Sequence, residues 1–212
     1  MSASIRGFIL DYGEVICHRP TPQQIARLAS ATGLDLDTFA ARYQEDRGLY
    51  DRGDLSLAEY WSRVISPSVV LSDTLIEQLR QWDVDMWSDV DCDMIDWLAA
   101  LRDAGFKTAL LSNMHADMAL KLRGSFEWPR QLDYVVLSCE VRLIKPDPAI
   151  YQRCVAGLQL APAETCFIDD RQVNVDAARG TGLTALLFQG IARLRNDLIQ
   201  LGTSVLPEDS AR

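Results

Sequence analysis

The chain has 212 residues, of which 48% are hydrophobic, so it can bury the core of one large domain or of one domain with a modest insert. Its formal net charge of −9 argues against a nucleic-acid partner, because phosphate backbones would be repelled. Five cysteines without a C-x-x-C spacing argue against a zinc site or a disulfide framework. The start lacks an apolar signal core and no apolar run is long enough to span a bilayer, so we expect a cytoplasmic protein without a membrane partner.

The first predicted element is a short buried strand over residues 7–10 that ends in a carboxylate, Asp11. Open α/β sheets bind ligands beyond the carboxyl ends of their strands, and the nearby Gly13 would let the backbone approach a ligand. An Asp-x-Gly sequence is also common in ordinary turns, because both residues favour turns. Asp11 is therefore a candidate site residue that needs support from the rest of the chain.

The segment after this strand predicts helices. Ranges with helical spacing are 21–30, 37–50, 57–65 and 72–82, and the expected breakers are Gly33, Gly53 and Pro67. Thr21-Pro22 suits an N-cap followed by proline, and Ser56 with Glu59 matches a capping box. Because one crossover helix needs far fewer residues, we predict a helical insert at 17–87 in a domain formed by 1–16 and 88–212.

Beyond the insert, strand-like runs alternate with helical patterns. The predicted strands are 108–111, 134–137, 166–168 and 184–188, and the predicted helices are 91–104, 147–158 and 173–179. This alternation predicts an α/β fold with a parallel sheet and helices on both faces. The tail carries one short helical stripe from Leu194 to Leu201, and residues 207–212 are expected to be disordered.

Polar groups suited to a phosphate follow three of these runs. Ser112 and Asn113 end the second strand, Lys145 precedes a Pro-Asp-Pro turn, and Asp169-Asp170 end the fourth strand. Each has an ordinary alternative, since Lys145 could be a surface lysine and the acidic pair could be a helix N-cap stabilised by the helix dipole.

The order of these polar residues resembles the four motifs of the haloacid dehalogenase-like hydrolase superfamily: Asp11, Ser112, Lys145 and the Asp169-Asp170 pair. The resemblance covers residues 6 to about 188. It is strongest to the branch that holds the phosphatase domain of soluble epoxide hydrolase and bacterial sugar-phosphate phosphatases. It implies a Rossmann-like core, and it makes the small helical insert a cap that covers the active site and selects the substrate.

The resemblance also implies a function. Asp11 would be the catalytic nucleophile that forms an aspartyl-phosphate, which water then hydrolyses. Ser112, Asn113 and Lys145 would bind the phosphoryl group, and Lys145 would also be catalytic by neutralising charge. The chain would therefore be a Mg²⁺-dependent phosphomonoesterase whose partner is a small phosphorylated metabolite such as a sugar phosphate.

The implied metal ligands are the Asp11 carboxylate, the Gly13 backbone carbonyl and the Asp170 carboxylate, all hard oxygen ligands of the kind that Mg²⁺ prefers. Most phosphatases of the family carry a second aspartate at the position of Gly13, which protonates the leaving oxygen. Glu14, a cap residue or the substrate would have to supply that proton here.

Two other function classes stay open. A 2-haloacid dehalogenase uses the same aspartate without a metal, but the dehalogenases that this chain resembles have Asp-x-Tyr-Gly-Thr and a fourth motif of Ser-Asn character. A weakly active or non-catalytic phosphate-binding domain is the third class, and Gly13 is the best argument for it.

Several residues of the insert could face a polar substrate: Arg42, Tyr43, Arg47, Tyr50, Arg52 and Trp61. Tyrosine and tryptophan at helical spacing more often pack a core, and arginine is more often a solvated surface charge. His18, Arg19 and His115 are further candidates because they lie close to the motifs.

Overall fold

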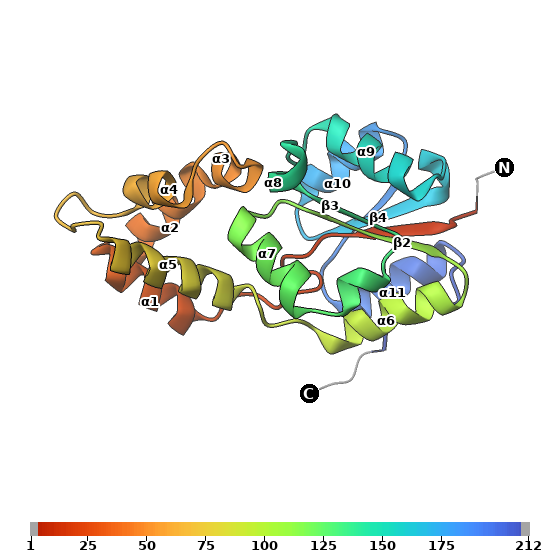
Figure 1. Ribbon diagram of the computed structural model, residues 1–212. Coiled ribbons are helices and arrows are strands. Elements are labelled where there is room, and N and C mark those ends of the chain that lie inside the picture. Colours follow the sequence, from red (N-terminus) through yellow and green to blue (C-terminus); the bar gives the residue numbers. More distant parts are fainter. Residues whose placement is uncertain (1–3, 209–212) are drawn as a thin grey trace.

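The computed structural model describes residues 4–208, and a parallel sheet forms its centre. The strands are β1 (Gly7–Leu10), β2 (Lys107–Ser112), β3 (Tyr134–Leu137), β4 (Thr165–Asp169) and β5 (Thr184–Leu187). Their order is β3-β2-β1-β4-β5, so β1 lies between β2 and β4. Figure 1 shows the sheet in the right-hand part of the molecule. The predicted α/β fold with a Rossmann-like parallel sheet is confirmed.

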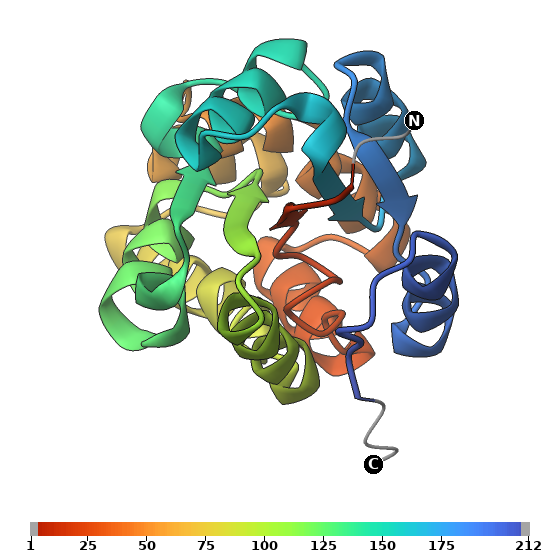
Figure 2. The ribbon, with the colours of Figure 1, turned by 90° about the vertical axis from the view of Figure 1, so that its right-hand side faces the viewer.

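Helices cover both faces of the sheet (Figure 2). Along β1, Phe8 and Leu10 pack with α6 (Cys92–Asp103), α7 (Ala116–Ser125) and α11 (Ile191–Gln200), whereas Ile9 packs with α9 (Pro148–Leu158) and α10 (Gln172–Gly180). Successive side chains of a strand point to opposite faces, which accounts for this division. Two short 3-10 helices, η1 (Trp128–Gln131) and η2 (Pro162–Glu164), lie in the connections.

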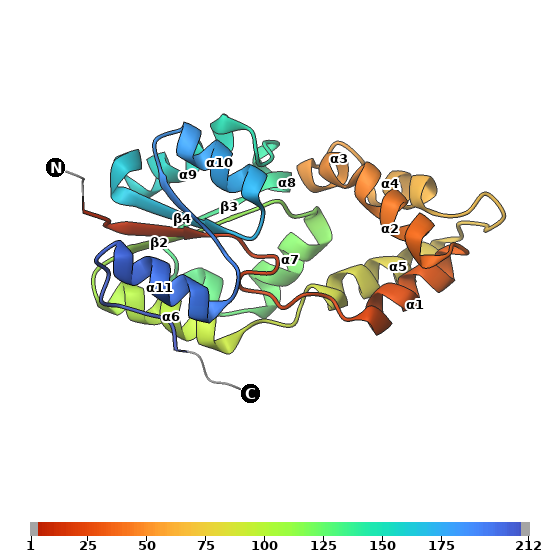
Figure 3. The same cartoon turned by 180° about the vertical axis from the view of Figure 1, so that it is seen from behind.

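A second group of helices follows β1 and lies to one side of the sheet (Figures 1 and 3). Its members are α1 (Pro22–Thr32), α2 (Leu36–Glu45), α3 (Arg47–Arg52), α4 (Leu57–Val64) and α5 (Asp73–Met86). They share an apolar cluster of their own that includes Leu28, Phe39, Tyr60, Trp61 and Leu79. We call these five helices the cap; the domain boundaries at 16/17 and 87/88 stay a prediction.

The helix caps and breakers that the sequence predicts in the cap are found at most of its helix ends. Gly33 and Gly53 end α1 and α3 in the left-handed conformation, at φ 70° and φ 81°. Both Thr21 and Ser56 form capping boxes. The single helix predicted over 37–50 is wrong, because the chain breaks at Asp46, whose short polar side chain favours helix ends over helix interiors.

The C-terminal segment packs on the domain. Leu194 and Leu198 of α11 are buried, and Trp97 Nε1 donates a hydrogen bond of 3.0 Å to the Val205 carbonyl. Pro207 is buried too, so the disorder expected from that position is wrong there; residues 209–212 lie outside the described part of the chain. Within the described residues, none of the helices combines the length and hydropathy needed to cross a bilayer.

One buried hydroxyl connects the cap to the sheet domain. Ser138, the first residue of α8 (Ser138–Val141), is fully buried. Its Oγ donates to the Asp51 carbonyl of α3 at 2.5 Å and accepts from the Met114 backbone N–H at 2.8 Å. This hydroxyl therefore fixes the end of α3 to the loop that follows β2.

We expect Ser138→Ala to lower the free energy of unfolding by about 1–3 kcal/mol, because it leaves the buried Asp51 carbonyl and Met114 N–H without this partner. Urea denaturation measures the change. Ser125→Ala, at an exposed position of α7, is the control and should stay within about 0.5 kcal/mol of the wild type. Equal stability of the two variants would contradict a structural role for the Ser138 hydroxyl.

Candidate functional site

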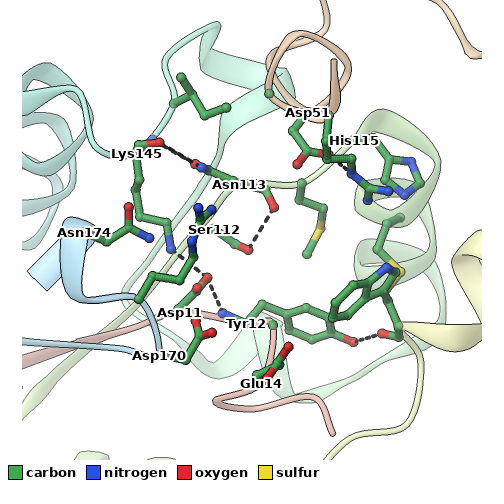
Figure 4. A pocket seen from close by; sticks show the side chains of 18 of the residues that line it. Asp11, Tyr12, Glu14, Asp51, Ser112, Asn113, His115, Lys145, Asp170 and Asn174 are labelled. Carbon is green, nitrogen blue, oxygen red and sulfur yellow. Dashed lines mark hydrogen bonds and ion pairs between the residues drawn. The ribbon is translucent and has the colours of Figure 1, made fainter. Parts of the chain in front are cut away.

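A pocket of about 560 Å³ lies between the carboxyl ends of the central strands and the cap (Figure 4). All six site residues predicted from the sequence line it: Asp11, Gly13, Ser112, Asn113, Lys145 and Asp170. They meet because β1 pairs with both β2 and β4, with Leu10 opposite Leu110 and Ile168. The chain crosses from one side of β1 to the other at this edge, which is where open α/β sheets bind ligands.

Lys145 lies at the centre of the site and is only 4% exposed, so it is not a surface lysine. Its Nζ lies 2.8 Å from Asp11 Oδ1 and 2.7 Å from Asp169 Oδ2. Burial alone would lower the pKa of Lys145, but the two carboxylates outweigh it and raise that pKa. Lys145 therefore stays charged between two acidic strand ends.

Asn113 fixes the backbone of Lys145. Its Oδ1 accepts from the Lys145 backbone N–H at 2.8 Å, and its Nδ2 donates to the Lys145 carbonyl at 3.0 Å. The side-chain amide that the sequence assigned to the phosphoryl group thus holds the lysine loop. Ser112 Oγ has only a 3.5 Å contact with the Asn113 carbonyl, so its hydroxyl can turn towards a ligand.

Asp11, Asp169 and Asp170 bring carboxylate oxygens within 4.8 Å of one another. Asp169 is saturated: Oδ1 accepts from the Arg171 backbone N–H at 2.8 Å and from Asn174 Nδ2 at 2.9 Å, and Oδ2 faces Lys145. Asp170 forms no ion pair with a basic side chain in the described residues. Asp11 and Asp170 are thus the carboxylates left for a cation, and their hard oxygens fit Mg²⁺.

Both of these carboxylates hold protons more tightly than an ordinary aspartate. Burial, together with the neighbouring Asp169, raises the pKa of Asp11 to about 7 although Lys145 opposes the shift. Burial and the charges of Asp169 and Glu14 raise the pKa of Asp170 to about 6. A bound divalent cation would relieve this repulsion, because it favours the charged form of each ligand.

Gly13 has space for a side chain. Its backbone is outside the left-handed region, and a Cβ built there would meet only Trp87 Cζ3, at 3.6 Å. The next residue, Glu14, has φ 56° and lines the pocket while its carboxylate pairs with Arg19 at 2.6 Å. The sequence suggested Glu14 as a substitute acid, and the structure places it at the pocket.

Of the cap residues that were predicted to face a substrate, some line the pocket and others do not. Tyr43 and Arg47 line it, whereas Tyr50 and Trp61 do not. All three aromatic residues pack in the apolar cluster of the cap. Arg42 binds the Ile65 carbonyl and Arg52 pairs with Asp54, and neither lines the pocket. His115 lines it, but His18 and Arg19 do not.

Asn174 and Asp51 are among the pocket residues that the sequence analysis did not single out. Asn174 holds Asp169 from the first turn of α10, and Asp51 pairs with Arg47 from α3. A polar residue four positions after Asp170 was a signal for Asn174. Nothing in the sequence separated Asp51 from the other acidic residues of the insert.

A model of the haloacid dehalogenase-like hydrolase family matches residues 81–182. The chain is related to the haloacid dehalogenase-like hydrolases. This match contains the Ser112, Lys145 and Asp169-Asp170 motifs, so the resemblance drawn from them is confirmed.

Curated relatives include both phosphatases and dehalogenases. The chain is 30% identical to bifunctional epoxide hydrolase 2 of Rattus norvegicus over 54% of its own length and 22% of that protein. It is 33% identical to (S)-2-haloacid dehalogenase 1 of Pseudomonas sp. (strain CBS-3) over 47% of its length and 44% of the relative. D-ribitol-5-phosphate phosphatase of Bacteroides thetaiotaomicron is 23% identical over 92% of this chain and 97% of the relative. The chain thus spans less than half of the first two.

Solved structures share the fold. A haloacid dehalogenase family enzyme of Bacteroides thetaiotaomicron, in complex with magnesium and inorganic phosphate, superposes with a TM-score of 0.69. The two chains are 21% identical, and the superposition covers 87% of this chain and 94% of the other.

The raised pKa values of Asp11 and Asp170 predict a pH-dependent affinity for Mg²⁺. Because the cation binds the deprotonated carboxylates, affinity should rise as the pH passes through about 6 and about 7 and should level off above. Calorimetric titration between pH 5 and pH 8 measures this. Asp170→Asn should weaken binding at every pH, whereas Asp103→Asn, an exposed site on α6, should not. Equal affinity at pH 5 and pH 8 would contradict the ligand assignment.

Proposed function

We propose that this protein is a Mg²⁺-dependent phosphomonoesterase that acts on a small phosphorylated metabolite through an aspartyl-phosphate on Asp11. The observation that carries the proposal is the arrangement at the strand ends. Lys145 bridges Asp11 and Asp169, while Asp170 remains for a cation. The relation to a ribitol-phosphate phosphatase and to a magnesium and phosphate complex supports it.

The geometry gives Asp11 one oxygen for the reaction. Its Oδ1 accepts from the Tyr12 backbone N–H at 2.7 Å and faces Lys145 at 2.8 Å, which leaves Oδ2 for attack. Attack on phosphorus forms the acyl-phosphate while the bond to the leaving oxygen breaks, and water later releases phosphate. Bound Mg²⁺ would offset the repulsion between the carboxylate and the phosphate. Ser112 would donate its hydroxyl to a phosphoryl oxygen.

The second candidate is a 2-haloacid dehalogenase, and the relation to (S)-2-haloacid dehalogenase 1 favours it. The Asp170 carboxylate favours the phosphatase, because it lies within 4.8 Å of Asp11 without a basic partner in the described residues and suits a cation that dehalogenation does not need. Assays of phosphate release and chloride release, each with and without Mg²⁺, separate the two.

Asp11→Asn tests the nucleophile. The amide is nearly isosteric but much less nucleophilic, so phosphate release should fall by roughly 10³-fold or more while the protein stays folded. Asp103→Asn should retain wild-type activity. Beryllofluoride with Mg²⁺ should form its adduct on Asp11 of the wild type, and an adduct on another carboxylate would overturn the assignment.

Gly13→Asp tests whether the site lacks only its general acid. A Cβ meets only Trp87 at 3.6 Å and the backbone is not left-handed, so aspartate can be accommodated. Activity on alkyl phosphates, whose leaving groups need a proton, should rise by roughly 10²- to 10⁴-fold. The gain on p-nitrophenyl phosphate should be much smaller.

Gly13→Asn is the matched control, because it adds a side chain of the same shape that cannot act as an acid. It should show no gain on alkyl phosphates. A folded Gly13→Asp protein that binds Mg²⁺ and is no faster than Gly13→Asn would indicate that another group already supplies the proton.

A further inference from the structure

The wall of the pocket that faces the strand ends is built on one buried arginine of the cap. Arg47 Nε donates to Asp51 Oδ1 at 2.9 Å, and Nη1 lies 3.3 Å from both oxygens of Asp83 and also contacts the Tyr43 hydroxyl. Figure 4 shows Asp51 and His115 across the pocket from Asp11 and Asp170. This wall is therefore placed for the leaving group of a phosphate ester.

Hydrogen bonds hold the guanidinium group of Arg47 in place, but they do not use all of its N–H groups. The Arg47 side chain is 14% exposed, and its Cζ lies 4.8 Å from the centre of the Tyr43 ring. The hydrogen bonds of Arg47 in the described residues use Nε and Nη1. Arg47 lines the pocket, and none of these hydrogen bonds uses Nη2, so this amino group remains for a ligand.

The charge of this wall does not favour a second anion. Arg47 contributes one positive charge and faces two carboxyl groups. Burial raises the pKa of Asp51, whereas the charge of Arg47 outweighs burial at Asp83 and lowers the pKa of that carboxyl. Burial lowers the pKa of His115 to about 3, so the imidazole adds no positive charge at neutral pH. The cluster therefore carries no net positive charge, whether or not Asp51 is protonated, although it presents an N–H donor.

We propose that Arg47 Nη2 is a specificity-determining donor for an uncharged oxygen, such as a hydroxyl, on the leaving group, and that the Asp51 and Asp83 carboxylates disfavour a second anionic group. The substrate class is then a monophosphate ester of a neutral polyol. This inference rests on the proposed phosphatase function, and it adds a residue and a selection rule to it.

The test uses three esters of equal chain length: D-ribitol 5-phosphate, pentyl phosphate and D-ribonate 5-phosphate, which carries a terminal carboxylate. The wild type should prefer the ribitol ester to both others in kcat/KM. Arg47→Lys keeps a cation beside Asp51 and Asp83 but lacks the free amino group. Its preference for ribitol over pentyl phosphate should fall by roughly 10- to 100-fold. Arg63→Lys, an exposed cap position paired with Asp46, should keep the wild-type preference.

Asp51→Asn tests the charge argument by itself, since the amide oxygen can still accept from Arg47 Nε. Removing one negative charge should reduce the discrimination against D-ribonate 5-phosphate. Calorimetric affinities of the three esters for the Asp11→Asn protein with Mg²⁺ give the same comparison without turnover.

The outcomes separate the two proposals. If no ester is hydrolysed, the phosphatase function fails, and the calorimetric affinities still test the donor: a preference for the ribitol ester that Arg47→Lys removes supports it. Equal affinity for the ribitol and pentyl esters, or a preference unchanged by Arg47→Lys, overturns the role of Arg47. Equal handling of the ribitol and ribonate esters by the wild type overturns the selection rule, whether or not Arg47→Lys folds.

Discussion

The site depends on the pair of contacts that the buried ammonium of Lys145 makes with Asp11 and Asp169. Three carboxylates gather within 4.8 Å at the ends of neighbouring strands, and each would lose hydration there without compensation. A buried charge is stable only when it is paired and its other donors or acceptors are satisfied. The surrounding structure meets that condition, because Asn113 holds the lysine backbone on both sides and Asn174 holds Asp169.

The adjacent residues Asp169 and Asp170 therefore have different roles. Asp169 ends β4 and is turned into the protein, where the lysine and two N–H donors saturate it. Asp170 lies one residue later, outside the strand, where its carboxylate faces the pocket. Successive residues of an extended chain point in opposite directions, so one member of the pair can position the lysine while the other remains for a cation.

The sequence was sufficient to predict the sheet and the meeting of the four motifs at one edge of it. Short apolar runs define parallel strands, and the carboxyl ends of such strands meet at one edge. It could not show which face of the cap helices meets the pocket. Tyr43 and Trp61 both pack in the apolar cluster of the cap, yet Tyr43 also lines the pocket and Trp61 does not. Which face of a cap helix meets the pocket is decided by the packing of distant segments against that helix, which a helical pattern alone does not reveal.

The two ends of the pocket differ in the balance of their charged groups. At the strand ends, Lys145 leaves a carboxylate excess that only a cation can balance before a phosphate dianion enters. At the cap, Arg47 is balanced by Asp51 and Asp83, so it can direct a hydrogen bond without attracting an anion. On the proposed function and selection rule, a substrate with one phosphate would have a single favourable orientation, with its phosphate at Asp11 and its neutral end at the cap. Specificity and chemistry would then be separated along the pocket, and the Ser138 hydroxyl joins the end of α3 at the cap to the loop after β2 at the strand ends.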